Sequence, residues 1–150
     1  MPVFAELPAD LDTPLSAYLR LRPGPYAFLL ESVEGGEKWA RYSFLGSDPL
    51  VVLSAKNGRI TLRRAGGRTE RLPDGDPLEA LRALLKEVQP VAVPGLPRFQ
   101  GGAVGFLGYD MVSHMERLPR VAKDDLGLPD AVFLLTETLP DRACRPARSR

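Results

Sequence analysis

Residues 50–63 have the sequence LVVLSAKNGRITLR, and this stretch decides the fold. The apolar run over residues 50–55 predicts one strand, and Ile60 and Leu62 alternate with polar residues as in a second strand. Between them lies Asn57-Gly58, a strong signal for a two-residue turn, because both residues tolerate the positive φ of a type I′ turn. The stretch therefore predicts an antiparallel hairpin.

Further strands are expected on both sides of this hairpin. Apolar and aromatic segments alternate with short segments rich in Gly, Ser and Asp, which is the pattern of successive antiparallel strands. The expected strands cover residues 26–33, 38–45, 69–72, 101–107 and 130–136, and a turn is expected at 46–49.

Helices are expected at two proline-led starts. Thr13 and Asp76 each precede a proline, and a capping residue followed by Pro at the first helical position is a common helix start. Glu79 lies three residues after Asp76, as in a capping box, and a leucine-rich stripe follows it. A third helix is expected over residues 109–118. The predicted fold class is α+β, an antiparallel β-meander sheet with two or three packed helices.

Length and composition restrict the class of protein. The chain has 150 residues, 44% of them apolar and 26% charged, which is typical of a soluble domain or of an incomplete piece of one. No apolar run approaches the roughly 18 residues of a membrane span. The net charge of +1 gives no reason to expect nucleic acid as a partner. A single cysteine fits a reducing cytoplasm.

The end of the chain differs in character from the rest. Residues 140–150 hold four arginines and one acidic residue, Asp141, with two prolines. We therefore expect residues 1–139 to form a domain, which the chain holds incompletely, and residues 140–150 to be a basic tail that is disordered or frame-shifted.

Residue chemistry alone reveals no active site. The only histidine, His114, excludes a multi-histidine zinc site, and nothing near the only cysteine, Cys144, activates a thiol. The glycines of residues 101–108 lack the spacing of a dinucleotide-binding loop, so close backbone packing explains them better. The pair Asp124-Asp125 lacks the further oxygen ligands of a cation site and is expected to be a solvated turn.

Two longer motifs resemble anthranilate synthase component I. Residues 28–49, FLLESVEGGEKWARYSFLGSDP, contain the family's Leu-Leu-Glu-Ser strand, a Gly-containing turn, Arg-Tyr-Ser-Phe and a Gly-x-x-Pro turn. Residues 101–110, GGAVGFLGYD, resemble its next recurrent motif. The resemblance covers roughly residues 4–139, and it implies the N-terminal portion of a larger fold in which two sheets pack face to face. Strands at 101–107 and 130–136 would then have unpaired edges.

The resemblance also implies a function. The family converts chorismate to anthranilate with magnesium, takes ammonia from a partner glutaminase subunit, and is inhibited by tryptophan. Its catalytic and magnesium-binding residues lie in a C-terminal chorismate-binding region that these 150 residues do not match. No catalytic residue, metal ligand or cofactor is therefore carried over. The expected role is tryptophan sensing in the cytoplasm, by a chain that is inactive alone.

The inhibitor site is expected at the Leu-Leu-Glu-Ser motif, which binds tryptophan in the family. An amino acid needs acceptors for its ammonium group, donors for its carboxylate and an apolar slot for its side chain. Residues of the neighbouring strand could reach the same place, although adjacent residues alternate between faces. The candidate tryptophan-binding residues are Ser32, Glu31, Leu30, Arg41, Tyr42 and Ser43.

Three alternatives remain. The leucines of the motif could be plain core, with Glu31 in a surface ion pair with Lys38 or Arg41 that is worth about 0–1 kcal/mol. The family could be the related para-aminobenzoate synthase component I, which also uses chorismate. The chain could also be an interaction module that binds a glutaminase or another protein and has no ligand.

Overall fold

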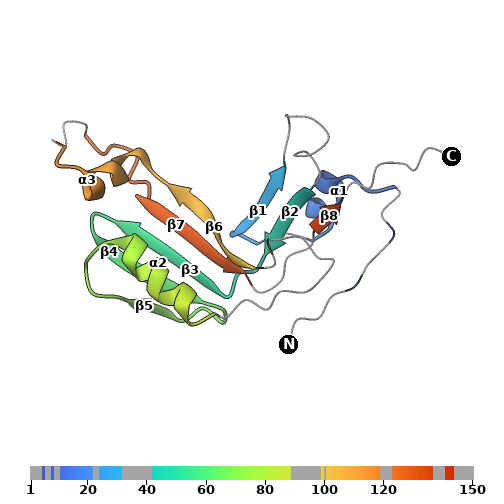
Figure 1. The fold of residues 1–150 in the computed structure, drawn as a ribbon, viewed down its shortest axis with the longest axis horizontal. Helices are drawn as coiled ribbons and strands as arrows, with labels where there is room; N and C mark the ends of the chain where they lie inside the picture. Colours follow the sequence, from blue (N-terminus) through green and yellow to red (C-terminus); the bar gives the residue numbers. More distant parts are fainter. Residues whose placement is uncertain are drawn as a thin grey trace. The chain divides into compact units, whose positions relative to one another are not determined.

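The computed structural model divides the chain into two compact units, which are described separately (Figure 1). The first unit comprises Met1–Asp48, Val91–Gln100 and Thr138–Arg150, and the second comprises Pro49–Pro90 and Gly101–Glu137. The structure describes residues 5, 8, 11–21, 24–31, 42–88, 99, 101–118, 123–136 and 141–143.

The second unit contains a five-stranded antiparallel sheet with the order β5-β4-β3-β7-β6. The hairpin predicted from residues 50–63 forms its centre, because Asn57 (φ 50°) and Gly58 (φ 77°) make the tight turn between β3 and β4. The strands are β3 (Val51–Lys56), β4 (Arg59–Arg64), β5 (Thr69–Arg71), β6 (Gly102–Leu107) and β7 (Ala131–Thr136).

The core of this unit lies on one face of the sheet, under helix α2 (Pro77–Lys86). Leu53 and Leu62 come from the central hairpin and are fully buried, and Leu84 is a buried residue of the helix that belongs to the same core cluster. Burying a side chain of this size contributes about 1.5–3 kcal/mol, so this layer carries much of the stability of the unit. The helix begins at the predicted cap, because the Asp76 carboxylate accepts a hydrogen bond from the amide of Leu78. The Glu79 carboxylate accepts a hydrogen bond from Arg82 instead of completing the expected capping box.

The glycine-rich stretch allows β6 to lie unusually close to β7. A Cβ atom at Gly105 would lie 2.0 Å from the carbonyl oxygen of Val132, and one at Gly108 would lie 3.1 Å from that of Asp130. The Gly108 amide donates a 2.7 Å hydrogen bond to this same Asp130 oxygen. The interpretation of these glycines as close backbone packing is therefore confirmed.

The helix predicted over residues 109–118 is shorter than expected. It consists of a 3-10 turn, η1 (Tyr109–Met111), and one turn of α-helix, α3 (Val112–Met115). Glu116 is extended, with φ −134°, and ends the helix. Met111 is buried in the core of the sheet and anchors this short segment.

The first unit contains helix α1 (Pro14–Arg20) and a separate three-stranded sheet with the order β1-β2-β8. Thr13 caps the helix as predicted, with reciprocal hydrogen bonds between Thr13 and Ser16. The strands are β1 (Ala27–Glu31), β2 (Tyr42–Ser47) and β8 (Asp141–Ala143), and each neighbouring pair is antiparallel.

Two features of the first unit differ from the sequence-based expectation. Gly46 and Ser47 continue β2 by pairing with β1, so the turn expected at 46–49 starts only at Asp48, where φ is 50°. Residues 141–143, in the tail for which disorder was one expectation, form β8, because their main chain pairs with β2; the other expectation, a frame shift, stays a prediction. The α+β class is confirmed, and its antiparallel strands belong to two sheets. Within the described residues no helix is long and apolar enough to cross a membrane.

The close approach of β6 and β7 makes Gly105 a sensitive position. We expect Gly105→Ala to lower the free energy of unfolding by about 1–3 kcal/mol, because the methyl group overlaps the Val132 carbonyl and the strands must separate. Urea denaturation followed by circular dichroism measures the change. Gly75→Ala is the matched control, since no atom lies within 4 Å of the added carbon, and it should change stability by less than about 0.5 kcal/mol. Equal denaturation midpoints would contradict the close-packing argument.

Candidate functional site

The β1–β2 pair brings four of the six candidate residues together. The register places Glu31 opposite Ser43 and Leu30 opposite Phe44, with Tyr42 next along β2. These residues lie at the end of the pair where β1 finishes and β2 begins. The other two candidates, Ser32 and Arg41, lie outside the described residues.

Strand geometry divides these residues between two faces. Residues directly opposite each other in an antiparallel pair point to the same face, and adjacent residues point to opposite faces. Glu31 and Ser43 therefore share one face, while Leu30, Tyr42 and Phe44 share the other. Four side chains on two faces do not form one pocket. A ligand that uses both sets must lie at the end or along the edge of the pair.

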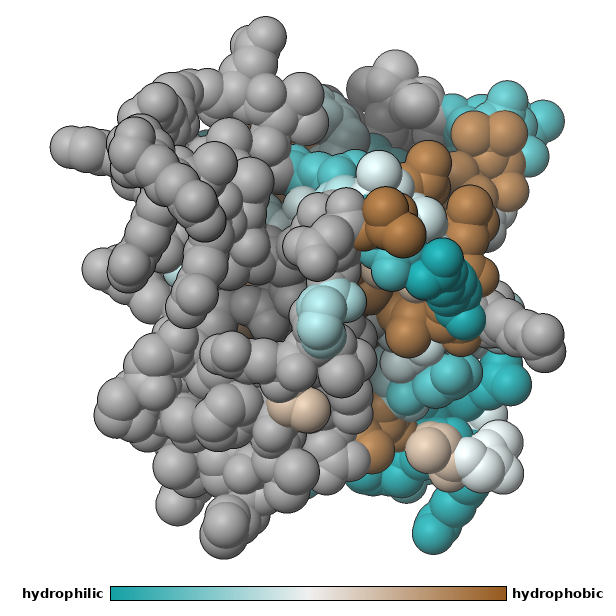
Figure 2. All heavy atoms as spheres, turned by 90° about the vertical axis from the view of Figure 1, so that its right-hand side faces the viewer, coloured by the Kyte–Doolittle hydropathy of each residue, from teal (hydrophilic) through white to brown (hydrophobic). Residues whose placement is uncertain are grey.

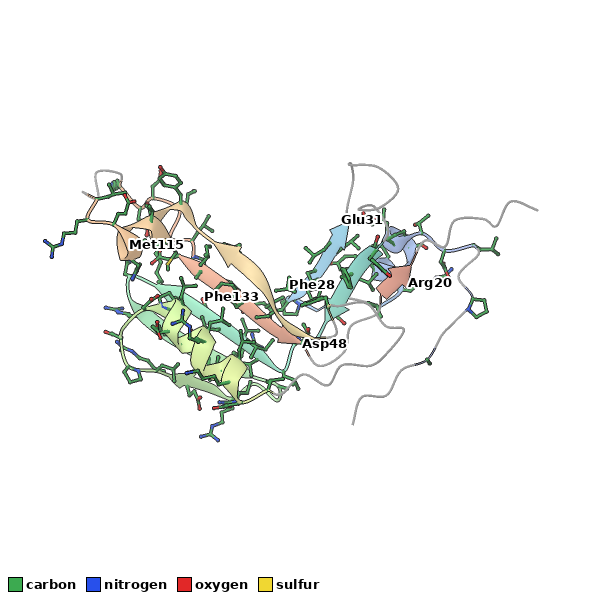
Figure 3. The ribbon with its side chains drawn as sticks, viewed as in Figure 1. Arg20, Phe28, Glu31, Asp48, Met115 and Phe133 are labelled. Atoms are coloured by element: carbon green, nitrogen blue, oxygen red, sulfur yellow. The ribbon has the colours of Figure 1, made fainter. Side chains whose placement is uncertain are left out.

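The second of these faces is aromatic. The Tyr42 and Phe44 rings stack with their centroids 6.1 Å apart, and the Phe99 ring meets Phe44 edge-on at 5.4 Å. The Phe28 ring covers Gly46, where a Cβ atom would lie 2.6 Å from the ring (Figure 3). Sequence reasoning did not include Phe99 among the candidates. Its position directly before the glycine-rich motif was the available signal.

The aromatic face is partly open to solvent. Leu30 is 45% exposed, and the Tyr42, Phe44 and Phe99 side chains are only half-buried. Figure 2 shows apolar and hydrophilic surfaces side by side on one side of the molecule. Half-exposed aromatic rings beside an exposed leucine retain apolar surface that a further apolar group could cover.

The first face is polar at the same end of the strand pair. Glu31 is exposed at the end of β1 and Ser43 is half-buried opposite it, whereas Leu45, two residues further along β2, is buried. The alternative role for Glu31, a surface ion pair with Lys38 or Arg41, involves two residues outside the described ranges. It remains an alternative to ligand binding.

A charged cluster in the second unit has a structural role. The Lys56 ammonium group lies 2.5 Å from an Asp124 carboxylate oxygen and donates a hydrogen bond to the Leu128 carbonyl. The neighbouring Asn57 amide donates a 2.5 Å hydrogen bond to Asp130. These contacts tie the segment 123–130 to the β3–β4 turn. Asp124, expected in a solvated turn, is thus a partner of Lys56 that the sequence pattern did not reveal.

The same contacts shift both pKa values. The hydrogen bond to Asp124 raises the pKa of Lys56, and the contact with Lys56, helped by the Gly127 amide, lowers the pKa of Asp124. Both shifts favour the charged forms, as expected for an ion pair near the surface.

The described residues do not fit a metal ion. Among them, no three His, Cys, Asp or Glu side chains gather closely enough to hold one. His114 is exposed on α3, and Asp124 is already paired with a lysine. The part of the chain that the structure describes therefore offers no magnesium site.

A hollow along α2 is a weaker candidate than the strand pair. Leu78, Leu81, Arg82, Leu85 and Lys86 line it, and all five come from one helix. Its charged groups are cations, so it offers no carboxylate for an ammonium group. The β1–β2 pair, in contrast, has the Glu31 carboxylate at its end.

The fold is that of an α+β protein whose β1–β2 strand pair carries a polar face and an aromatic face. No family model matches the chain. It is 43% identical to anthranilate synthase component 1 of Acetivibrio thermocellus over 137 residues, which are 91% of this chain and 28% of that protein. It is 47% identical to the Mycolicibacterium smegmatis protein of the same name over 139 residues, covering 90% of this chain and 26% of that protein.

A solved structure agrees with these relatives. Anthranilate synthase component I from Streptococcus pneumoniae TIGR4 superimposes with a TM-score of 0.53 at 29% identity, covering 99% of this chain and 34% of that chain. The resemblance indicated by the two motifs is therefore confirmed: the chain is homologous to the N-terminal part of anthranilate synthase component I. It spans 26% to 34% of the length of these relatives.

The Lys56–Asp124 contact makes stability depend on pH at both extremes. Because the folded pKa of Asp124 is below its ordinary 3.8, its contribution is present above that value and is lost as the pH falls through the folded pKa. Because the folded pKa of Lys56 is above 10.5, its contribution is present below 10.5 and is lost as the pH rises through the folded pKa.

We therefore expect Asp124→Asn to lower the melting temperature at neutral pH, and the difference from the unsubstituted chain to shrink in acid. Thermal melts from about pH 2.5 to pH 7 measure it. Asp125→Asn, at the exposed neighbouring position, is the control and should leave the melting temperature unchanged. If the melting-temperature difference between Asp124→Asn and the unsubstituted chain stays constant through the acid range, the Lys56–Asp124 ion pair is not its cause.

Proposed function

We propose that this chain is the tryptophan-sensing part of an anthranilate synthase component I, the part through which the pathway's end product inhibits the enzyme. The observation that carries the proposal is the register of β1 and β2, which brings Leu30 and Glu31 of the Leu-Leu-Glu-Ser motif opposite Phe44 and Ser43. Homology to proteins named anthranilate synthase component 1 supports it.

The strand pair supplies groups of the chemistry that tryptophan requires. The Glu31 carboxylate is an acceptor for the ammonium group, and the Ser43 hydroxyl on the same face is a donor for the carboxylate. The half-exposed rings of Tyr42 and Phe44 on the other face offer apolar contact for an indole.

The position of β1 at a sheet edge explains how one ligand can use both faces. The order β1-β2-β8 leaves the outer side of β1 without a partner strand among the described residues. A tryptophan lying along this edge can contact main-chain groups of β1 and reach side chains of either face. Ser32, which the family resemblance also implies in tryptophan binding, follows directly in the sequence and lies outside the described residues.

The activity of the whole enzyme would reside largely outside this stretch. Conversion of chorismate to anthranilate, with ammonia from a glutaminase subunit, would use catalytic residues of the C-terminal chorismate-binding region that the family resemblance implies. Magnesium, the cofactor of the full-length family, would likewise be held by other residues, since the described ones do not fit it. In this proposal the chain alone is inactive. Tryptophan inhibits by favouring one arrangement of this part and the catalytic part, while chorismate favours another.

The para-aminobenzoate branch is the nearest alternative. The curated relatives that match are named anthranilate synthase component 1, which favours the anthranilate branch. An interaction module without a ligand is the remaining alternative. Tryptophan binding separates it from the proposal, because a purely protein-binding module has no reason to bind a free amino acid.

The test is a nitrogen–proton correlation NMR spectrum of the chain titrated with L-tryptophan. We expect saturable shifts that concentrate at Leu30, Glu31 and residues 42–44. D-Tryptophan, which presents the same groups with the wrong chirality, should bind more weakly. Absence of shifts, or shifts confined to the strands of the second unit, would contradict the proposal.

Substitution at the polar face gives a second readout. We expect Glu31→Gln to weaken tryptophan binding about 10- to 100-fold, because a charge-assisted hydrogen bond contributes about 1.5–3 kcal/mol. Glu70→Gln on β5 is the matched control and should leave the affinity unchanged. Calorimetric titration measures both. Equal affinities of the two variants would assign Glu31 to the surface and not to the ligand.

A further inference from the structure

We propose that Asn57 is a modification site, at which the folded chain converts its only asparagine to aspartate and isoaspartate through a succinimide ring. The site lies in the β3–β4 turn of the second unit and is independent of tryptophan binding. The ring closes among atoms of Asn57 and Gly58 alone. The reaction therefore needs this turn and water, and no other part of the protein.

The reaction begins when the main-chain nitrogen of Gly58 attacks the side-chain carbonyl carbon of Asn57, Cγ. A Gly58 N–Cγ bond forms, the bond from Cγ to the side-chain nitrogen breaks, and that nitrogen leaves as ammonia with the proton from Gly58. Water then opens the ring, leaving its hydroxyl on a carbonyl carbon and returning a proton to the Gly58 nitrogen. Opening at Cγ yields aspartate, and opening at the main-chain carbonyl carbon yields isoaspartate.

The turn in the structure holds the two reacting atoms apart. Asn57 has φ 50°, Gly58 has φ 77°, and the flanking residues Lys56 and Arg59 are paired, which defines a type I′ turn. The first central residue of such a turn has a ψ of about +30°. Ring closure requires the Gly58 nitrogen to eclipse the Asn57 Cβ, which for an L-residue occurs at a ψ of about −120°, the value of a type II′ turn.

A flip of one peptide group brings the reacting atoms together. Turns of types I′ and II′ share a positive φ at the first central residue and differ in the orientation of the central peptide group. Both types connect the strands of a two-residue hairpin, so the flip leaves the pairing of β3 with β4 in place. Gly58 passes from positive to negative φ, which glycine does at little cost. The hairpin thus reaches the reactive geometry while it stays folded.

Hydrogen bonds hold the chain on both sides of the flipping peptide group. The Asn57 amide donates to the Asp130 carboxylate at 2.5 Å, and the Gly58 carbonyl accepts from the Gly75 amide at 3.0 Å. These bonds involve the preceding and the following peptide groups, so the flip leaves both of them in place. They fix the ends of the turn while its centre rotates.

The dipeptide Asp74-Gly75 provides an internal control, because it can form the same ring by loss of water. Two contacts oppose ring closure there. The Asp74 carboxylate lies 2.9 Å from Arg71, which favours its ionised form, and an ionised carboxylate is a poor target for a nucleophile. The Gly75 nitrogen, which would attack, donates its hydrogen to the Gly58 carbonyl. The structure therefore distinguishes a reactive pair from an unreactive one.

The two products differ in their effect on the hairpin. Aspartate leaves the main chain unchanged and is itself common in type I′ turns. Isoaspartate directs the main chain through Cβ and Cγ, which adds a methylene group between Lys56 and Arg59. A two-residue loop fixes the register of its hairpin, so the longer link no longer fits the pairing of β3 with β4. Isoaspartate therefore weakens the hairpin at the centre of the sheet as the protein ages.

The test is incubation of the whole chain at neutral and mildly alkaline pH, followed by peptide mass spectrometry and enzymatic labelling of isoaspartate. We expect conversion at Asn57 that accelerates with pH, because the deprotonated Gly58 nitrogen is the nucleophile, and no isoaspartate at Asp74. The rate should be about 3- to 30-fold lower than in urea, since only a small conformational free energy separates the two turn types.

Two results would overturn the assignment. Reaction only through global unfolding would give a native rate equal to the rate in urea multiplied by the unfolded fraction, which is about 10⁻³ or less for a stable domain. Urea denaturation of the same sample measures that fraction. Isoaspartate that forms at Asp74 as fast as at Asn57 would show that the geometry of the turn does not select the site.

A matched variant tests the consequence for stability. Asn57→Gly removes the reactive amide and keeps a residue that suits a type I′ turn. After incubation, the unsubstituted chain should contain a second population that unfolds at lower urea concentration, and its share should equal the isoaspartate content. The unfolding curve of Asn57→Gly should not change with age. Equal losses of stability in the two proteins would show that Asn57 is not the cause.

Discussion

The pairing of β3 with β7 is the constraint on which the second unit depends. Leu53 lies opposite Phe133 at the middle of this pair, so the ladder joins segments that are far apart in the sequence. Within the sheet, β4 and β5 follow next to β3, and β6 follows next to β7. The helix, the buried Met111 and the loop tied to Lys56 all pack on or around strands that this pairing holds in place.

Local signals predicted much of this fold. The Asn57-Gly58 turn, the Thr13 cap and the Asp76 cap depend on interactions between residues close in sequence, and each formed as expected. The glycines of the 101–108 stretch were also interpreted correctly, because absence of a side chain has a direct meaning where backbones approach. These features arise from steric and hydrogen-bonding rules that act within a few residues.

Features set by distant parts of the chain were not predictable in the same way. Residues 26–56 contain no local signal that β2 pairs with β8 and β3 with β7. These pairings divide the strands between two sheets, where one continuous meander was expected. The extension of β2 through Ser47 depends on its partner Ala27, and the contact of Lys56 with Asp124 depends on the return of a loop from much later in the chain. Tertiary contacts override local turn preference in such places.

The candidate site shows the same division between local and distant information. The motif residues were identified from sequence, but the register decides which of them share a face, and it separates Glu31 and Ser43 from Leu30 and Tyr42. Phe99 joins the aromatic face from a distant segment, so a list drawn from the motifs alone omitted it. Each sheet also has two edge strands that lack an outer partner among the described residues, β1 and β8 in one sheet and β5 and β6 in the other. A strand edge offers directional main-chain groups to whatever approaches it. At β1 the two faces beside the edge differ, because Glu31 lies on one face and Leu30 on the other.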